Sequence, residues 1–376
     1  MTITKIYNKE LGEQSSNRNL IICMDGTWND ETGKDGDGII TNIRKLYNSF
    51  ENDSSAQISR YFRGVGNDED NTKFGIIVGG VTGKNEKRIR DDAYSTIVKE
   101  YITGDKIFIF GFSRGAASAR MLASQLNREG IPQKITITTE EKMNRTTRQI
   151  ENHFVRYVSE GIKKNVDVQF LGVWDTVGAF GIPVKIMGIP FHRWNLFENM
   201  HVSPNVKRAV HLVGIDETRD PFQPTLMNYN PEVVDEIWVP GVHSDVGGGY
   251  PEDQLGCISL KLMIDRVNTF TKENSLNPLR FNHKTLENYT KCKDNIYFHF
   301  HGLGYKKSIR NIFVQKNDVS NTDNNIKPCI HNSVKMLQQS SDVYSIVTTK
   351  KEQNIFHIIY NPTNIKYLKN NYDIVD

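Results

Sequence analysis

The fold is decided by the stretch KIFIFGFSRGAASARMLASQL, which occupies residues 106–126. The run from Lys106 to Phe110 is rich in isoleucine and phenylalanine, which predicts a buried strand. The small residues from Ala116 to Leu126 predict a helix. Between them lies a Gly-x-Ser-x-Gly pattern centred on Ser113. A sharp turn from strand to helix exposes such a serine, and the turn requires glycine two positions before and two positions after it.

Segments on both sides of this stretch alternate between strand and helix patterns. Strands are expected at 20–24, 58–62, 168–174 and 233–239, and helices at 43–50, 86–102, 140–165, 205–213 and 254–270. Such alternation is typical of an α/β fold whose mostly parallel central sheet is flanked by helices. Together with the serine turn, it predicts an α/β-hydrolase-like fold with insertions and a C-terminal cap.

The length of 376 residues favours one large domain. We expect residues 1–18 to form a disordered tail, residues 19–336 the α/β-hydrolase domain, and residues 337–376 a C-terminal extension packed on that domain. The tail lacks the apolar stretch of a secretory signal peptide, and no apolar run is long enough for a transmembrane helix. The protein is therefore expected to be cytoplasmic as synthesised, with any membrane contact peripheral.

Charge and cysteine content narrow the classes of partner. The 47 basic and 44 acidic residues leave a formal net charge of +3, which argues against nucleic acid and against acidic ligands. The four cysteines are widely spaced and show neither a Cys-x-x-Cys pair nor zinc-ligand spacing. This spacing fits a reducing compartment and predicts no metal site.

A serine hydroxyl needs a base to remove its proton as it attacks, and histidine titrates in the right range. His243 is the best candidate, because it follows the last strong strand and comes after Asp175 in the chain. The order Ser113, Asp175, His243 is the α/β-hydrolase order, with Asp175 as the carboxylate that orients the imidazole. His211 is the alternative base, and Asp216 and Asp245 are competing carboxylates, although Asp245 would more readily orient its own loop.

An oxyanion hole needs two donors aimed at the developing negative oxygen. The residue after the nucleophile supplies one backbone amide, here Arg114. The turn that follows Asp25 after an early strand would supply the second, from Gly26 or Thr27, although a plain tight turn explains it equally well.

Two further stretches carry open interpretations. Residues 79–84, GGVTGK, suggest a phosphate-binding loop but lack its required first glycine and its closing Ser or Thr. The apolar stretch 180–191 would serve either as a lid or as a packed loop, and the packed loop is favoured.

Four motifs together resemble the DUF2235 family: DGTWN at 25–29, GFSRGA at 111–116, VWDTVG at 173–178 and PGVHSDVGGGY at 240–250. Asp216-Glu217 with Arg219, and HNSV at 331–334, resemble further elements of that family, so the resemblance spans about 19–336. DUF2235 is similar to the catalytic domain of Tle1-type type VI secretion phospholipase effectors. The resemblance implies the same three residues, Ser113, Asp175 and His243, as a catalytic triad.

The expected function is hydrolysis of carboxylic esters through an acyl-enzyme, with glycerophospholipid as the leading substrate class and no metal or organic cofactor. The resemblance further implies delivery into a target cell and a secretion-system or immunity partner. Two alternatives remain open. One is an esterase or thioesterase acting on a small acylated metabolite, and the other is a non-catalytic binding module that keeps the fold.

Overall fold

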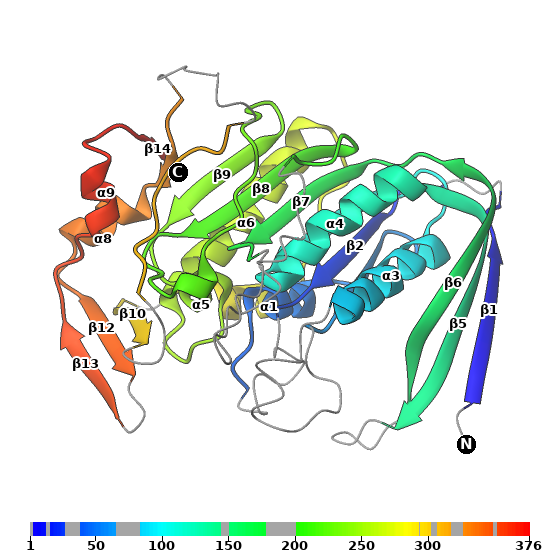
Figure 1. Cartoon of the computed structure of the whole chain (residues 1–376), viewed down its shortest axis with the longest axis horizontal. Helices are drawn as coiled ribbons and strands as arrows, with labels where there is room; N and C mark the ends of the chain where they lie inside the picture. The colour runs from blue at the N-terminus through cyan, green and yellow to red at the C-terminus, as the bar shows by residue number, and fades with distance from the viewer. Residues whose placement is uncertain are drawn as a thin grey trace, which may run out of the picture.

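The described residues contain a parallel sheet of eight strands in the order β14-β11-β9-β8-β7-β4-β2-β3 (Figure 1). Its strands are β2 (Asn19–Met24), β3 (Gln57–Phe62), β4 (Lys106–Phe112), β7 (Val168–Trp174), β8 (Val206–Gly214), β9 (Val234–Val239), β11 (Cys329–His331) and β14 (Asp373–Val375). The computed structural model describes residues 3–12, 16–26, 38–64, 83–143, 150–177, 201–292, 294–301, 307–316, 326–348 and 352–376. All five strands expected from the sequence belong to this sheet.

Helices cover both faces of the sheet, which confirms the α/β-hydrolase-like fold. In Figure 1, α3 (Gly83–Glu100) and α4 (Arg114–Glu129) lie in front of the sheet, and α1 (Asn42–Ser49) and α6 (Gln254–Glu273) lie behind it. Neighbouring residues in one strand serve opposite faces: Ile22 packs in the cluster under α3 and α4, and Ile21 in the cluster under α1 and α6. Burial on both faces explains why these strands are almost continuously apolar.

Two segments expected to be helical are strands instead. The described part of the region 140–165 falls in an antiparallel pair, with 140–143 at the end of β5 (Ile131–Met143) and 150–164 forming β6 (Ile150–Lys164). In β5, Ile135 and Ile137 are buried between polar neighbours, which is the alternation typical of a strand. In β6 only Phe154 is buried among the described side chains, so its pairing with β5 defines it as a strand. The region 205–213 forms β8, since its apolar run is buried on both faces of the sheet.

The N-terminal segment also differs from expectation. A disordered tail was expected, but residues 3–10 form the strand β1 (Ile3–Glu10), which pairs antiparallel with β5. β1 is thus the outer strand of a three-stranded arm with the order β1-β5-β6 (Figure 1). The Lys9 ammonium donates to the carbonyl oxygens of Lys99 and Tyr101, at 2.6 Å each, at the C-terminal end of α3. Backbone pairing and this cationic cap order a strand whose own side chains are mostly polar.

The C-terminal third builds a cap on the β9 side of the sheet. Its elements are β10 (Ile296–His301), α8 (Ser333–Gln339), β12 (Val343–Thr348), β13 (Gln353–His357) and α9 (Thr363–Tyr367). The helix α7 (His283–Thr290) instead packs against α1 and α6. β10, β12 and β13 form a small separate sheet, whereas β11 and β14 extend the central one. A third apolar cluster, which includes Trp238 and Phe298, joins the cap to the sheet.

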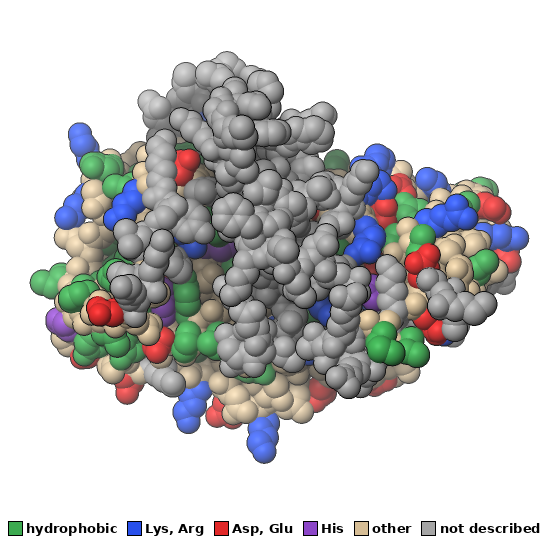
Figure 2. All heavy atoms as spheres, turned by 60° about the horizontal axis from the view of Figure 1, so that its bottom comes forward, with side chains coloured by type: hydrophobic (Ala, Val, Ile, Leu, Met, Phe, Trp, Pro, Cys, Tyr) green, Lys and Arg blue, Asp and Glu red, His purple; other side chains and the backbone are tan. Residues whose placement is uncertain are grey.

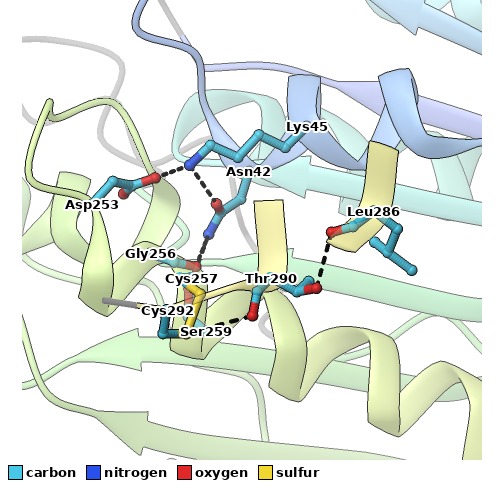
Figure 3. Close-up of a disulfide and its surroundings, with 9 residues drawn as sticks. All are labelled: Asn42, Lys45, Asp253, Gly256, Cys257, Ser259, Leu286, Thr290 and Cys292. Atoms are coloured by element: carbon cyan, nitrogen blue, oxygen red, sulfur yellow. Dashed lines mark hydrogen bonds and ion pairs between the residues drawn. A yellow bond between two sulfur atoms is a disulfide. The ribbon is translucent and has the colours of Figure 1, made fainter. Parts of the chain in front are cut away.

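A disulfide ties α6 to the segment after α7 (Figure 3). Cys257 and Cys292 are 35 residues apart in sequence, but the packing of α7 brings their Cα atoms to 5.7 Å. Close by, the Asn42 side chain on α1 donates to the Gly256 carbonyl oxygen at 2.9 Å. The bond contradicts the expectation of a reducing compartment, because structural disulfides persist in oxidising ones. The spacing of the cysteines could not reveal a pairing created by helix packing.

The surface mixes both signs of charge. On the face drawn in Figure 2, the basic and acidic side chains of the described residues are interspersed, in keeping with a formal net charge of +3. None of the helices in the ranges given above combines the length and the apolar character that a membrane crossing demands.

Candidate active site

Ser113 occupies a tight turn between β4 and α4. Its φ of 58° and ψ of −120° lie outside the ordinary regions for a residue with a side chain, so the turn holds it in a strained conformation. A Cβ added to Gly111 would lie 2.6 Å from the Gly115 carbonyl oxygen, and one added to Gly115 would lie 2.3 Å from the Met24 carbonyl oxygen. The first turn of α4 against Gly111, and the end of β2 against Gly115, therefore leave room only for glycine on both sides of Ser113.

The parallel sheet brings the three sequence candidates together at one edge. Ser113 follows β4, Asp175 follows the neighbouring strand β7, and His243 begins the short helix α5 (His243–Gly247) after β9. His243 Nε2 lies 2.8 Å from Ser113 Oγ, and His243 Nδ1 lies 2.6 Å from Asp175 Oδ2. All three residues are buried, with Ser113 the most exposed at 7%. The imidazole thus bridges the hydroxyl and the carboxylate.

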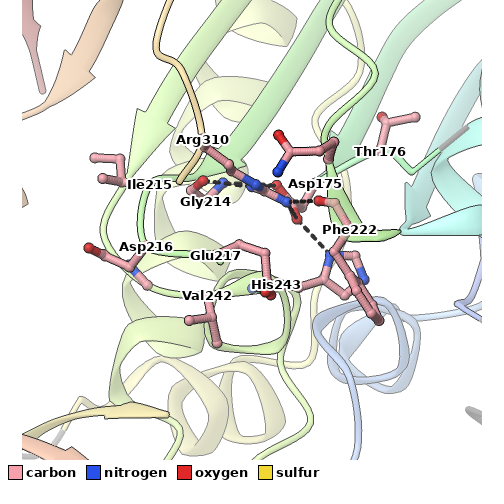
Figure 4. A network of polar contacts seen from close by, with 12 residues as sticks. Asp175, Thr176, Gly214, Ile215, Asp216, Glu217, Phe222, Val242, His243 and Arg310 are labelled. Atoms are coloured by element: carbon pink, nitrogen blue, oxygen red, sulfur yellow. Dashed lines mark hydrogen bonds and ion pairs between the residues drawn. The ribbon is translucent and has the colours of Figure 1, made fainter. Parts of the chain in front are cut away.

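Asp175 is held by a buried arginine that the sequence did not single out. Arg310 Nη1 donates to Oδ1 of Asp175 at 2.6 Å, and Nη2 donates to Oδ2 at 2.8 Å (Figure 4). The Gly214 amide also donates to Oδ1, at 2.9 Å. Burial alone would raise the pKa of Asp175, but the Arg310 charge and the hydrogen bonds from His243 and Arg310 outweigh it and hold that pKa well below its ordinary value. These contacts therefore favour the ionised carboxylate of Asp175 over the neutral acid.

Further groups hold the His243 backbone and ring. Glu217 Oε2 accepts from the His243 amide at 3.2 Å and from Arg219 Nη2 at 2.7 Å. The guanidinium of Arg219 sits 3.8 Å from the centre of the Phe222 ring, and Phe222 meets the imidazole edge-on with ring centres 5.0 Å apart. Burial lowers the pKa of His243 more than the hydrogen bond and charge of Asp175 raise it. A lowered pKa leaves the imidazole neutral and able to accept a proton near pH 7.

The competing carboxylates, Asp245 and Asp216, make contacts elsewhere than at the His243 ring. Asp245 accepts from the Val242 amide at 3.0 Å and lies 2.6 Å from His299 Nδ1, so it orders the loop rather than the His243 ring. Asp216 accepts from the Gly241 amide and from the Tyr360 hydroxyl.

His211, the alternative base, is fully buried in β8. Its Nε2 accepts from the Thr176 amide at 3.1 Å, and its Nδ1 lies 2.9 Å from Glu236 Oε2. Both ring nitrogens are therefore engaged away from Ser113.

The expected oxyanion-hole donors have different surroundings. Arg114 is the first residue of α4, directly after Ser113. The Gly26 amide donates to Asp25 Oδ1 at 2.7 Å, so in this structure it is occupied, and Thr27 lies outside the described residues. Asp25 also accepts from Thr41 and Tyr61, at 2.7 Å each, and burial raises its pKa to about 6. Asp25 thus stabilises the turn at the end of β2.

Several expectations fall outside the description. The apolar stretch 180–191 lies beyond the described residues, and of the glycine-rich stretch 79–84 only its last two positions, at the start of α3, are included. Within the described ranges, no group of three or more His, Cys, Asp or Glu side chains is arranged to hold a metal ion.

Sequence reasoning missed Arg310 and Phe222. Arg310 stands in the stretch SIRNIF at 308–313, which matches no motif and follows no predicted strand. The available signal was indirect: a carboxylate buried at the end of a central strand needs a cationic or hydrogen-bonding partner. The sequence indicated Glu217 and Arg219 only as part of a resemblance.

Comparison with known proteins places the chain in a family. Residues 18–266 match the family model described as "T6SS, Phospholipase effector Tle1-like, catalytic domain", a shorter span than the 19–336 that the motifs suggested. A curated relative, the uncharacterized protein YEL023C of Saccharomyces cerevisiae, is 31% identical over 251 residues, which is 58% of this chain and 34% of that protein. This chain therefore spans about a third of the length of the relative.

Two solved structures are similar to this chain at lower sequence identity. An uncharacterized protein from Pseudomonas aeruginosa is 20% identical with a TM-score of 0.46, over 74% of this chain and 49% of that one. A Tle1 effector bound to the VgrG spike of the type 6 secretion system is 22% identical with a TM-score of 0.38, over 65% and 53%. The family match supports a hydrolase of the lipase and esterase class. The chain belongs to the family of Tle1-like catalytic domains of type VI secretion phospholipase effectors.

Proposed function

We propose that this protein is a serine hydrolase that cleaves carboxylic esters, with Ser113 as nucleophile, His243 as general base and Asp175 as the carboxylate that orients it. The observation that carries the proposal is the buried imidazole of His243, whose two nitrogens lie 2.8 Å from Ser113 Oγ and 2.6 Å from Asp175 Oδ2. The Ser113 conformation and the two flanking glycines support it, because they are what a nucleophile turn requires.

The proposed reaction has two halves. Ser113 Oγ attacks the ester carbonyl carbon as His243 Nε2 takes the hydroxyl proton, and Asp175 stabilises the imidazolium that forms. His243 then passes that proton to the departing alcohol, which leaves the acyl group esterified to Ser113. In the second half, water attacks the acyl carbon as His243 takes its proton, and His243 then returns that proton to Ser113 Oγ as the acid leaves. The Arg114 amide would donate to the oxyanion, and because the Gly26 amide is already bonded to Asp25, Thr27 is our candidate for the second donor.

Glycerophospholipid is the proposed substrate class, on the strength of the Tle1-like family match. We also assign to this chain, as a proposal, delivery into a target cell with a secretion-system or immunity partner, by analogy with the effector that binds the VgrG spike. The proposed hydrolase unit extends from residue 19 to about 336, with 337–376 as an extension packed on it. β14, contributed by that extension, pairs with β11.

Replacing the nucleophile tests the proposal. Ser113→Ala should abolish hydrolysis of p-nitrophenyl butyrate and of phosphatidylethanolamine liposomes. The matched control is Ser118→Ala, which removes another buried hydroxyl from the same helix, five residues further on, and should keep both activities. Retained hydrolysis of both substrates by Ser113→Ala would refute the proposal.

Product analysis separates the substrate classes. Mass spectrometry after incubation with phospholipid should detect lysophospholipid and free fatty acid in equal amounts. Hydrolysis of the p-nitrophenyl ester without lysophospholipid would favour a small acylated metabolite instead. Failure of the folded wild type to react at Ser113 with a fluorophosphonate probe would favour the non-catalytic binding module.

A further inference from the structure

Arg310 makes a bidentate contact with the carboxylate of the proposed triad. The guanidinium is completely buried, and its two terminal nitrogens donate to the two oxygens of Asp175 at 2.6 and 2.8 Å. The same nitrogens donate to the carbonyl oxygens of Gly214, at 2.6 Å, and Phe222 (Figure 4). One arginine therefore ties together the end of β7, the end of β8 and the loop that carries Phe222.

The contacts of Asp175 divide between its two oxygens. Oδ1 receives Arg310 Nη1 and the Gly214 amide, whereas Oδ2 receives Arg310 Nη2 and faces His243 Nδ1. Two parallel N–H···O bonds fix the plane of a carboxylate as well as its position. The orientation of Oδ2 toward the imidazole is thus set by Arg310.

A second buried arginine, Arg18, makes the same kind of two-nitrogen contact with a carboxylate away from the proposed triad. Arg18 donates to both oxygens of Asp105, at 3.2 and 2.7 Å, and to the carbonyl oxygens of Ser54 and Glu100. Arg18 and Asp105 precede β2 and β4, at the edge of the sheet opposite Ser113. Both pairs have two carboxylate contacts and two carbonyl contacts, but within the described part of the chain no histidine contacts the Asp105 carboxylate. The Arg18 pair is therefore an internal control.

We propose that Arg310 is a positioning residue for the proposed hydrolysis, acting through Asp175 to orient His243 and to offset part of the negative charge that the imidazole meets. The inference rests on the proposed function of Ser113, Asp175 and His243. Arg310 lies beyond the matched span 18–266, so a residue outside the family match completes the site.

The charge effect has a defined sign. His243 is faced by Asp175 at the end of β7 and by Glu217 and Arg219 between β8 and β9, with Arg310 behind Asp175. Removing the Arg310 charge makes protonation of the His243–Asp175 pair more favourable, whichever of the two holds the proton. The apparent pKa of the pair then rises, and the enzyme needs a higher pH to have a free base. Arg310 thus extends activity toward lower pH.

The test compares pH profiles of kcat/KM on p-nitrophenyl butyrate for the wild type and three variants. Arg310→Met should move the acidic limb up by about one pH unit and reduce kcat/KM at pH 7 at least about tenfold. Arg310→Lys keeps the charge, so the limb should stay within about 0.3 unit, but a single ammonium cannot hold both oxygens and kcat/KM should fall at least about fivefold. Arg18→Met should lower the unfolding midpoint without moving the limb.

Each outcome has a separate meaning. An active wild type and a folded Arg310→Met whose acidic limb coincides with that of the wild type would overturn the role of Arg310 alone. If Arg310→Met does not fold, Arg310→Lys decides, because full kcat/KM in that variant would show that the bidentate contact is dispensable. A wild type that neither turns over ester nor reacts with a fluorophosphonate at Ser113 would overturn the proposed function itself.

Discussion

Replacing Asp175 by asparagine changes one atom of a fully buried carboxylate. Both oxygens of that carboxylate act as hydrogen-bond acceptors for their neighbours. Oδ1 must remain an oxygen, because Arg310 Nη1 and the Gly214 amide both donate to it. The new amide nitrogen therefore takes the place of Oδ2, 2.6 Å from His243 Nδ1. It donates to that nitrogen and drives the imidazole proton onto Nε2, which can then no longer accept from Ser113.

The expected loss follows from this tautomer change. In serine hydrolases the equivalent change lowers kcat by about 10⁴, which corresponds to about 5 kcal/mol of transition-state stabilisation. Arg310 Nη2 also loses its acceptor, so we expect a loss of about 3 kcal/mol in the free energy of unfolding. Ester turnover and urea unfolding measure the two quantities separately.

The matched control is Asp105→Asn, which disrupts the Arg18 pair at the other edge of the sheet. It should lower the free energy of unfolding to a similar extent and leave kcat of the folded enzyme within twofold of the wild type. A folded Asp175→Asn whose kcat stays within tenfold of the wild type would show that Asp175 does not set the tautomer, and would refute the reasoning.

Two more predictions concern the turns beside Ser113. Gly115→Ala would place a Cβ 2.3 Å from the Met24 carbonyl oxygen and 2.4 Å from that of Asp25, so the free energy of unfolding should fall by about 3 kcal/mol in urea; an unchanged midpoint would contradict the close approach. Burial raises the pKa of Asp25 from its ordinary value of 3.8 to about 6, so the folded state resists ionisation and wild-type stability is lost as the pH rises from about 4 to 6. Relative to Asp25→Asn, the wild type should lose about 2–3 kcal/mol between pH 4 and pH 7, and parallel pH profiles for the two proteins would show that Asp25 does not titrate in this range.

The sheet and the edge that brings Ser113, Asp175 and His243 together were predictable because their sequence signals are local. The apolar strand ending at Phe112 and the glycines around Ser113 determine a turn within a few residues. Asp175 and His243 each follow a strand, and parallel strands bring their carboxyl ends to the same edge. The structure brings these three side chains together as the chain order implied.

What escaped prediction depends on contacts between distant segments. The strand character of β6 comes from its pairing with β5 and from the packing of Phe154 and Tyr157 in the cluster beneath α3, while its composition is polar enough for a surface helix. By sequence alone, Arg310 looks like an ordinary surface residue. It lies 135 positions after Asp175 in the chain, and only folding brings the two side chains into contact. The pairing of Cys257 with Cys292 likewise exists because α7 packs against α6.

The N-terminal strand has a consequence for handling the protein. β1 covers the backbone of β5 from Lys134 to Glu141, a stretch in which isoleucine and threonine alternate. Shortening the chain past Glu10 would uncover eight consecutive residues of strand edge, a template on which a second molecule can add its own strand. Trimmed preparations should therefore associate through this arm and precipitate, even though the sheet edge that carries Ser113 is intact.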